Sequence, residues 1–202
     1  MSDVSVEQIK QLRSATGAGM MDCKAALVEA GGDYDRAVEL LREKGLASAA
    51  KRAGRSANQG LIESYIHFNN TVGVLAEVNC ETDFVANTDE FHQLAKDICL
   101  HIASPAAPRF VSRDQVPDEE LEYEKKIFET QARESGKPDA VIEKIVQGKL
   151  QAHLENVVLL DQKFVKDDSK TIQQLLDDVS AKVGEKVAVR RFVRYKLGED
   201  AE

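Results

Sequence analysis

The residues that most often carry enzyme chemistry form no familiar catalytic or metal-binding motif in this sequence. None of the four histidines has the spacing of a metal-ligand pair such as H-E-x-x-H: His67, His92, His101 and His153. Adjacent carboxylates such as Asp177 and Asp178 fall on helix starts or solvated faces. Acidic residues near a helix N-terminus usually stabilise the helix through its dipole and do not serve catalysis. The glycine turn at 17–19 begins like a dinucleotide-binding fingerprint, but Asp22 occupies its third glycine position. We therefore expect no active site, no metal and no cofactor.

Composition and charge describe a globular protein with no preference for nucleic acid or membranes. Hydrophobic residues make up 43% of the 202 residues, charged residues 31%, and the formal net charge is −8. A negative field repels phosphate groups, which argues against a primary nucleic-acid-binding function. No run of residues approaches the roughly 20 apolar residues of a transmembrane helix. We expect no direct nucleic-acid partner and no membrane partner.

Cysteine usage and the N-terminal residues favour a cytoplasmic location. Cys23, Cys80 and Cys99 are odd in number and have no close-pair spacing, which is typical of reduced, buried thiols. The first five residues lack the basic and apolar regions of a signal peptide. We therefore expect a soluble, cytoplasmic protein.

Residues 77–86 read Glu-Val-Asn-Cys-Glu-Thr-Asp-Phe-Val-Ala and join a predicted strand to a predicted helix. Residues 72–80 alternate apolar and polar side chains, which indicates a half-buried strand. Asn87, with Glu90 three residues later, resembles a capping box, and apolar residues at helical spacing extend to Ile102. The elements that must position this stretch are therefore one strand and one helix.

The connection between that strand and that helix carries an aromatic residue beside a carboxylate. Its residues are Thr82, Asp83, Phe84 and Val85. Two interpretations remain open from the residues alone. Phe84 could pack under the following helix, as large apolar side chains usually do, with Asp83 accepting hydrogen bonds from nearby amides. Alternatively, Phe84 could be exposed and enter a pocket of another protein.

The first 45 residues predict three short helices. Apolar residues recur at helical spacing over 6–12, 20–30 and 37–41, with glycine-rich turns between these runs, and Ser5 is the expected cap of the first helix. Such a bundle is near the lower size limit for independent folding, and its architecture resembles ubiquitin-associated domains. Met20 and Met21 are about 100° apart on a helix, so we expect one in the core and one on the surface.

Residues 45–56 are small and basic, which predicts a linker at a domain boundary, with a helical start as one option. The charges of Lys51, Arg52 and Arg55 are then expected to be solvated, with contact to RNA as the alternative. Further on, the patterns predict strands over 60–68, 72–80 and 187–197, a helix from Thr171 to Gly184, and an αα-hairpin of helices 118–134 and 138–156.

Together these elements predict an α+β fold. A three-helix, ubiquitin-associated-like bundle precedes a small antiparallel sheet of about three strands, with helices on one face and an inserted αα-hairpin. The predicted domains are a helical module with a basic linker (1–54), an α/β core for dimerisation (55–116 and 157–202), and the inserted hairpin (117–156).

Two long motifs resemble the bacterial elongation factor Ts family. Residues 13–27, Arg-Ser-Ala-Thr-Gly-Ala-Gly-Met-Met-Asp-Cys-Lys-Ala-Ala-Leu, resemble its N-terminal signature, and residues 77–86 resemble its second signature. Residues 136–138 and 164–172 also resemble the family, and the matches follow the family's order over most of the chain.

The resemblance implies a guanine-nucleotide exchange factor, not an enzyme, that binds elongation factor Tu in its GDP-bound and nucleotide-free forms. In that family the aromatic of the second signature, here Phe84, is pushed between two helices of the GTPase, disturbs its magnesium site and releases GDP. The implied partner-binding residues are Thr82, Asp83, Phe84 and Val85, and in the N-terminal module Arg13, Met20 and Met21. Whether Asp83 orients the turn or repels charge in the GTPase stays open.

Longer members of the family carry two α/β subdomains, whereas this chain has one, which implies a homodimer. Three alternatives come from other function classes. A ubiquitin-associated-type adaptor would bind a partner protein through the turn at 17–20, and Phe84 would have no role. An RNA-binding protein would use the basic residues of 51–55 and the arginines of 190–194 and would show steep salt dependence. A small enzyme is the third, although no residue pattern identifies its chemistry.

Overall fold

The computed structural model describes residues 4–16, 18–52, 54–134 and 138–199. The chain forms two compact units, the first from residues 1–61, 78–94 and 176–188 and the second from residues 62–77, 95–175 and 189–202. Each unit is described by itself below. The predicted three-part domain division stays a prediction. The predicted α+β fold class is confirmed, with eight α-helices and a small antiparallel sheet among the described residues.

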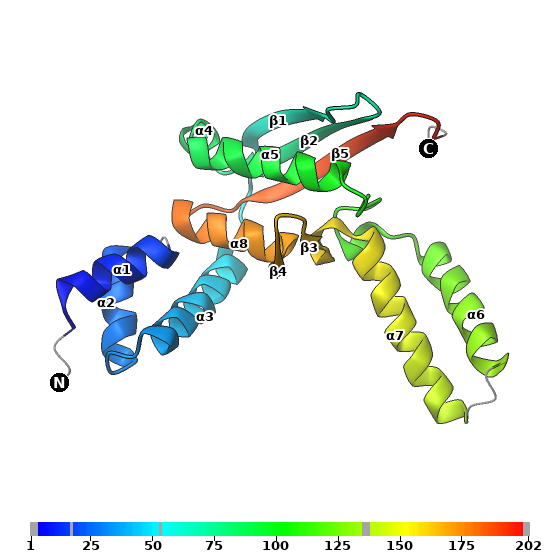
Figure 1. The fold of residues 1–202 in the computed structure, drawn as a ribbon, viewed down its shortest axis with the longest axis horizontal. Coiled ribbons are helices and arrows are strands. Elements are labelled where there is room, and N and C mark those ends of the chain that lie inside the picture. The colour runs from blue at the N-terminus through cyan, green and yellow to red at the C-terminus, as the bar shows by residue number, and fades with distance from the viewer. Residues whose placement is uncertain (1–3, 17, 53, 135–137, 200–202) are drawn as a thin grey trace. The chain divides into compact units, whose positions relative to one another are not determined.

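The first unit begins with the predicted three-helix bundle, formed by α1 (Val6–Thr16), α2 (Met20–Glu29) and α3 (Tyr34–Arg52) (Figure 1). Ser5 caps α1 as predicted, because its Oγ accepts a hydrogen bond from the Gln8 backbone N at 3.2 Å while Gln8 Oε1 accepts from Ser5 N at 3.0 Å. The bundle has its own apolar core: Ile9, Leu12, Cys23, Ala26, Leu27, Ala37, Leu40 and Leu41. Gly17, part of the predicted glycine turn, lies outside the described residues.

The stretch 45–56 begins as a helix, which the prediction allowed, but the helix extends to Arg52, so the linker prediction is wrong up to that residue. Helix α3 continues through Gly45 to Arg52, and a Cβ built on Gly45 would lie 3.9 Å from the Ala181 side chain. Arg52 is buried and its Nε donates a hydrogen bond to Ser180 Oγ at 3.3 Å. Gly45 and Arg52 therefore both lie against α8 (Ile172–Val183), and Arg52 has a structural role.

The sheet has the strand order β1–β2–β5, with β1 Gln59–Ile66, β2 Val72–Cys80 and β5 Ala188–Lys196. Helix α5 (Asp89–Ala103) runs along it, and in the second unit Cys99 Sγ donates a hydrogen bond to the Glu63 carbonyl oxygen at 3.5 Å (Figure 1). The predicted cap of this helix shifts by one residue. Thr88, not Asn87, accepts the hydrogen bond from Phe91 N, at 3.2 Å.

The second unit contains the predicted αα-hairpin, formed by α6 (Asp118–Glu134) and α7 (Asp139–Val157). The two helices lie side by side in Figure 1 and pack through a small core of Ala132, Ile142 and Val146. The predicted connection at 135–137 lies outside the described residues. Two single 3₁₀ turns flank the hairpin in the sequence, Arg113–Gln115 and Leu159–Asp161.

Helix α8 (Ile172–Val183) follows Thr171 as predicted. Thr171 Oγ1 accepts from Gln174 N at 3.2 Å and Gln174 Oε1 accepts from Thr171 N at 3.0 Å. The helix ends at Val183 and is followed by Gly184, whose φ of +75° is the left-handed conformation that glycine adopts without strain. Three short elements were not predicted: α4 (Asp83–Ala86) and the antiparallel pair β3 (Lys163–Phe164) and β4 (Asp167–Thr171).

Candidate functional site

The connection after β2 is a one-turn helix, α4, and not an irregular turn. Thr82 is its N-cap, and its Oγ1 accepts a hydrogen bond from Val85 N at 3.4 Å. The turn closes when Ala86 N donates to the Thr82 carbonyl at 3.2 Å and Asn87 N donates to the Asp83 carbonyl at 3.1 Å. The Asn87 side-chain Nδ2 also donates to that carbonyl, at 2.8 Å. Asn87, predicted to begin the next helix, therefore ends this one.

Phe84 projects from α4 into solvent with 83% of its surface exposed. The interpretation that Phe84 packs under the following helix is therefore wrong, and Ala86 is the residue of α4 that is buried. Asp83 is exposed in the first turn, where a negative charge suits the helix N-terminus, and Val85 is partly buried. Leaving this phenylalanine in water forgoes about 1.5–3 kcal/mol of burial free energy, so the fold does not itself use the side chain.

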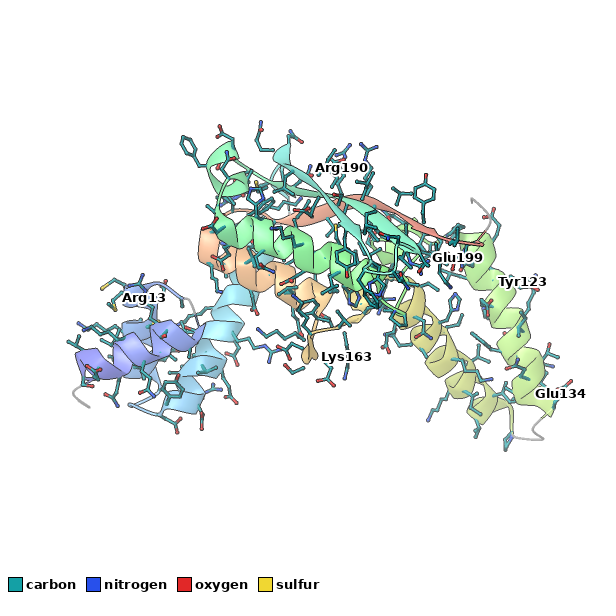
Figure 2. All side chains as sticks on the ribbon, turned by 45° about the horizontal axis from the view of Figure 1, so that its top comes forward. Arg13, Tyr123, Glu134, Lys163, Arg190 and Glu199 are labelled. Atoms are coloured by element: carbon teal, nitrogen blue, oxygen red, sulfur yellow. The ribbon has the colours of Figure 1, made fainter. Side chains whose placement is uncertain are left out.

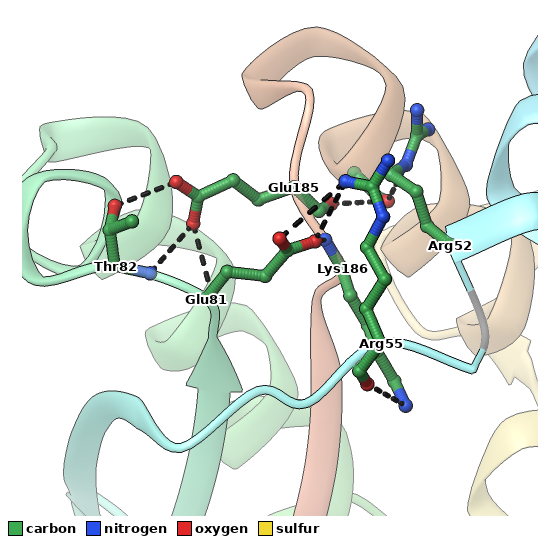
Figure 3. Close-up of polar contacts among 7 residues, drawn as sticks. Arg52, Arg55, Glu81, Thr82, Glu185 and Lys186 are labelled. Carbon is green, nitrogen blue, oxygen red and sulfur yellow. Dashed lines mark hydrogen bonds and ion pairs between the residues drawn. The ribbon is translucent and has the colours of Figure 1, made fainter.

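The carboxylate of Glu185, in the segment between α8 and β5, holds the start of α4 in place (Figure 3). Its Oε2 accepts hydrogen bonds from the backbone N of Glu81 at 3.1 Å and of Thr82 at 3.0 Å. Its Oε1 accepts a hydrogen bond from Thr82 Oγ1 at 2.6 Å. We call these three hydrogen bonds the Glu185 brace. The Thr82 hydroxyl thus donates to Glu185 and accepts from α4, and it links the two.

The Glu81 side chain in turn binds the segment that carries Glu185. Its Oε1 accepts a hydrogen bond from Lys186 N at 2.6 Å, and its carboxylate forms an ion pair with Arg55 Nη1 at 3.3 Å (Figure 3). The hydrogen bond from Lys186 N, assisted by Arg55, lowers the pKa of the Glu81 carboxyl below its usual value. The glutamate therefore stays ionised at neutral pH, and its charge is partly offset by a guanidinium.

Cys80, the last residue of β2, is buried next to this arrangement. Its Sγ donates a hydrogen bond to the Thr82 carbonyl oxygen at 3.1 Å. Burial, together with the charge of Glu185, raises the pKa of the Cys80 thiol to about 11. The group therefore remains a neutral thiol that donates a hydrogen bond, and it lacks the thiolate character of a nucleophile. The three cysteines are free and buried, as predicted.

The N-terminal residues that the sequence singled out are all on the surface of the bundle. Arg13 is exposed on α1 (Figure 2). Met20 and Met21 are 40% and 74% exposed, so the prediction that one of them lies in the core is wrong. Cys23 and Leu27 fill that core instead. Two adjacent methionines at a helix start form a soft apolar surface that adapts to different shapes.

Sequence reasoning missed Glu185 and Lys186 entirely and did not assign a role to Glu81. Glu185 contacts residues 103 and 104 positions away in the chain, so no local pattern reports it. The cations near 51–55 were expected to be solvated, yet Arg52 is buried and Arg55 pairs with Glu81. The glycine at 184 was the one available signal, because it marks where α8 ends and a new segment begins.

The described ranges contain no group of three or more histidine, cysteine or acidic residues that could hold a metal ion. Among the same residues, no helix combines the length and apolar character needed to cross a membrane. The arrangement around α4 holds an exposed aromatic side chain at a defined place, which is the chemistry of a contact surface.

Comparisons with known proteins match this chain to one family over nearly its whole length. The model of the family described as Elongation factor TS matches residues 25–199. An elongation factor Ts of Desulforamulus reducens is 54% identical over 202 residues, which cover 100% of this chain and 93% of the relative. One from Caldanaerobacter subterraneus is 52% identical over 199 residues, 98% of this chain and 99% of the relative. One from Anaeromyxobacter is 54% identical over 202 residues, 100% of this chain and 92% of the relative.

Proposed function

Because the chain belongs to the elongation factor Ts family of translation elongation factors, we propose that it is a guanine-nucleotide exchange factor for elongation factor Tu. The observation that carries the proposal is Phe84, which is 83% exposed on a helix whose start is held by long-range hydrogen bonds. The chain binds elongation factor Tu with GDP, promotes release of the GDP, and leaves the nucleotide-free GTPase to bind GTP.

Phe84 acts as the probe in this proposal. GDP in the GTPase is held partly by a magnesium ion that bridges phosphate and protein, and magnesium demands near-ideal octahedral geometry. Entry of Phe84 between two helices of the GTPase spreads them and spoils that geometry. Burying one phenylalanine supplies about 1.5–3 kcal/mol towards this distortion, and a central aromatic anchor is a common hot spot.

Exchange of this kind needs no covalent step, so the protein is not an enzyme in this proposal. Binding of the factor and binding of GDP are linked equilibria. If this chain weakens the binding of GDP by a given factor, GDP weakens the binding of this chain by the same factor. Thr82, Asp83 and Val85 support Phe84 in the contact.

The bundle supplies a second contact in this proposal. Met20, Met21 and Arg13 are exposed on neighbouring helices of the bundle and bind another helix of the GTPase domain. Methionine side chains are flexible and polarisable, so they adapt to an apolar helix surface, and Arg13 adds a charged contact. This second contact keeps the GTPase bound while Phe84 enters between its helices.

We also propose that the chain is a cytoplasmic homodimer. The support is a set of exposed apolar side chains on alternating positions of the sheet in the second unit: Ile62, Ile66, Leu75, Val193 and Tyr195. A second copy of the chain would cover this face. Light scattering at working concentration is expected to give the mass of two chains, and the mass of one chain contradicts the homodimer.

The test of the exchange proposal is release of a fluorescent GDP from elongation factor Tu by the wild-type chain, Phe84→Ala and Phe68→Ala. Phe68 is the matched control, since it is 86% exposed and lies in the turn between β1 and β2. We expect fast release with the wild type and with Phe68→Ala. Phe84→Ala should be slower by about tenfold or more, equivalent to about 1.4 kcal/mol of transition-state stabilisation.

Each contrary result has a distinct meaning. No acceleration by the wild type overturns the exchange function. If that chain still binds elongation factor Tu, the adaptor alternative replaces it, with the exposed methionines of α2 as the binding surface. Equal slowing by Phe84→Ala and Phe68→Ala shows that loss of an exposed aromatic has a general effect, and it contradicts the specific role of Phe84.

A further inference from the structure

The Glu185 brace joins the element that displays Phe84 to a segment more than 100 residues further along the chain. One carboxylate accepts three hydrogen bonds, from Glu81 N, Thr82 N and Thr82 Oγ1, at 3.1, 3.0 and 2.6 Å. The two backbone bonds fix the path of the chain as it leaves β2. The hydroxyl bond fixes the rotamer of Thr82, which is the N-cap of α4.

Helix α4 needs support from outside itself. It has four residues, whereas isolated helices shorter than roughly 12 residues are marginal in water because the first turn is costly to form. Its N-cap hydrogen bond, from Val85 N to Thr82 Oγ1, is long at 3.4 Å. Phe84, the largest side chain of the turn, contributes little packing because it is 83% exposed.

The carboxylate that supplies this support is itself held in place. The Glu185 carbonyl oxygen accepts a hydrogen bond from Ser180 Oγ on α8. The next residue, Lys186, donates its backbone N to the Glu81 carboxylate at 2.6 Å and its Nζ to the Arg55 carbonyl at 3.0 Å (Figure 3). Glu185 thus bonds to the backbone at 81–82, and Glu81 bonds to the backbone at Lys186. The segments on both sides of the brace are therefore held by hydrogen bonds.

We propose that Glu185 is a positioning residue for nucleotide exchange: its brace sets the orientation in which α4 presents Phe84 to the GTPase. This inference rests on the proposed exchange function. Glu185 does not touch the GTPase in this scheme and acts through Thr82 and the backbone of α4. Presenting Phe84 in one orientation spares the partner the cost of ordering the turn during binding.

The activity test uses the full-length chain and the release of fluorescent GDP from elongation factor Tu. Glu185→Gln keeps the size of the side chain but loses one acceptor oxygen, and Glu185→Ala removes the brace. We expect the maximal release rate to fall by about fivefold in Glu185→Gln, the effect of about one net hydrogen bond, and by more in Glu185→Ala, which loses all three bonds. The matched control is Glu90→Gln, whose glutamate pairs with Lys182 of α8 at 3.0 Å and takes no part in the brace. A normal rate with both Glu185 variants overturns the proposal.

A double-mutant cycle separates positioning of Phe84 from general damage. If the brace acts through Phe84, adding Glu185→Gln to Phe84→Ala should change the rate by less than about twofold. If the two effects multiply, Glu185 acts independently of Phe84 and the proposal is overturned. A slow Phe84→Ala with normal rates in both Glu185 variants overturns only the brace, whereas a normal Phe84→Ala overturns the Phe84 mechanism as well.

A measurement without the GTPase completes the test. Amide hydrogen exchange should be faster by about fivefold at Ala86 and Asn87, which close α4, when Glu185→Gln is compared with wild type. The amide of His92, in the first turn of α5, donates to the Thr88 carbonyl at 3.1 Å and should keep its protection from exchange. Unchanged exchange at α4, or equal acceleration at both places, contradicts the proposal.

Discussion

The β1–β2 hairpin displays an exposed phenylalanine near each of its two ends, and the two ends are built differently. At the turn end, Phe68 is 86% exposed, and at the other end, after β2, Phe84 is 83% exposed. The turn end is held mainly by local contacts, since Asn69 Oδ1 accepts from Thr71 N at 3.1 Å and from Thr71 Oγ1 at 2.7 Å. One distant backbone bond, from Leu197 N to the Thr71 carbonyl oxygen at 2.8 Å, adds to them, but no distant side chain does so among these bonds. The α4 end is held by Glu185, from a segment more than 100 residues away.

The difference teaches that exposure by itself does not identify a functional aromatic residue. A hairpin turn needs only its own residues, because two strands and a tight turn close the structure locally. The α4 end draws on α8 and on the segment before β5 to fix a single helical turn. Support of that extent at an otherwise marginal element indicates that the direction of Phe84 matters, and the predictions below test this contrast.

The largest expected effect comes from a glycine at the α4 end of the hairpin. Gly60 has a φ of +140°, and a Cβ there would lie 2.1 Å from the Val78 carbonyl oxygen. Gly73, near the turn end, would meet only the movable Cδ1 of Ile66, at 3.0 Å. We expect Gly60→Ala to lower the free energy of unfolding by about 2–4 kcal/mol, from strain and steric overlap.

Gly73→Ala is the matched control, since both changes add one methyl group and restrict the unfolded chain equally. It should change the free energy of unfolding by less than about 1 kcal/mol, in either direction. Urea unfolding of the two variants measures the difference. Equal losses would show that the two ends of the hairpin tolerate substitution alike, and the contrast would then lie in α4 alone.

The turn end was largely predictable from the sequence, and the α4 end was not. Alternating side chains over 60–68 and 72–80, with Asn69 and Asn70 between them, predict the hairpin because strand and turn signals are local. Helix caps at Ser5 and Thr171 were predicted for the same reason. Each of these features is encoded within about ten residues of sequence.

Spacing alone left the position of Phe84 open, because an aromatic residue at a connection is buried in most proteins. The resemblance to a family, not the local pattern, pointed to an exposed probe, and the structure exposes the side chain. Glu185 could not have been found at all, because its partners lie across the chain. The prediction that Arg52 is solvated failed for a related reason. A basic residue in a run of small residues is usually solvated, and its buried contact with Ser180 lies 128 positions away in the chain.

A smaller effect is expected at the turn end. Asn70 has a φ of +57°, in the left-handed region, where alanine is less favourable than asparagine by about 1 kcal/mol. Asn70→Ala should therefore lower the free energy of unfolding by about that amount, whereas Asn70→Gly should be neutral or slightly stabilising. Thermal unfolding measures both. Neither variant should alter GDP release, and a slower release with Asn70→Ala would show that the turn end also contributes to exchange.

The smallest effect is a pH dependence at the α4 end. The pKa of Glu81 is lowered by the hydrogen bond from Lys186 N and by Arg55, so the folded state favours the ionised carboxylate. This group contributes stability at pH values above its unfolded pKa, and the contribution is lost as the pH falls through the lower pKa of the folded state. The difference in unfolding midpoint between wild type and Glu81→Gln should therefore be largest near neutral pH and should shrink as the pH is lowered below about 4.5. Asp167→Asn in the second unit is a matched control, since the Asp167 pKa is lowered mainly by hydrogen bonds from Ser169, with a smaller contribution from the charge of Lys170, and both residues belong to its own strand. Because that contact is local, its loss should affect the unfolding midpoint but leave GDP release unchanged, whereas Glu81→Gln should slow release as the Glu185 variants do. Equal release rates for the two variants would place Glu81 outside the support of Phe84.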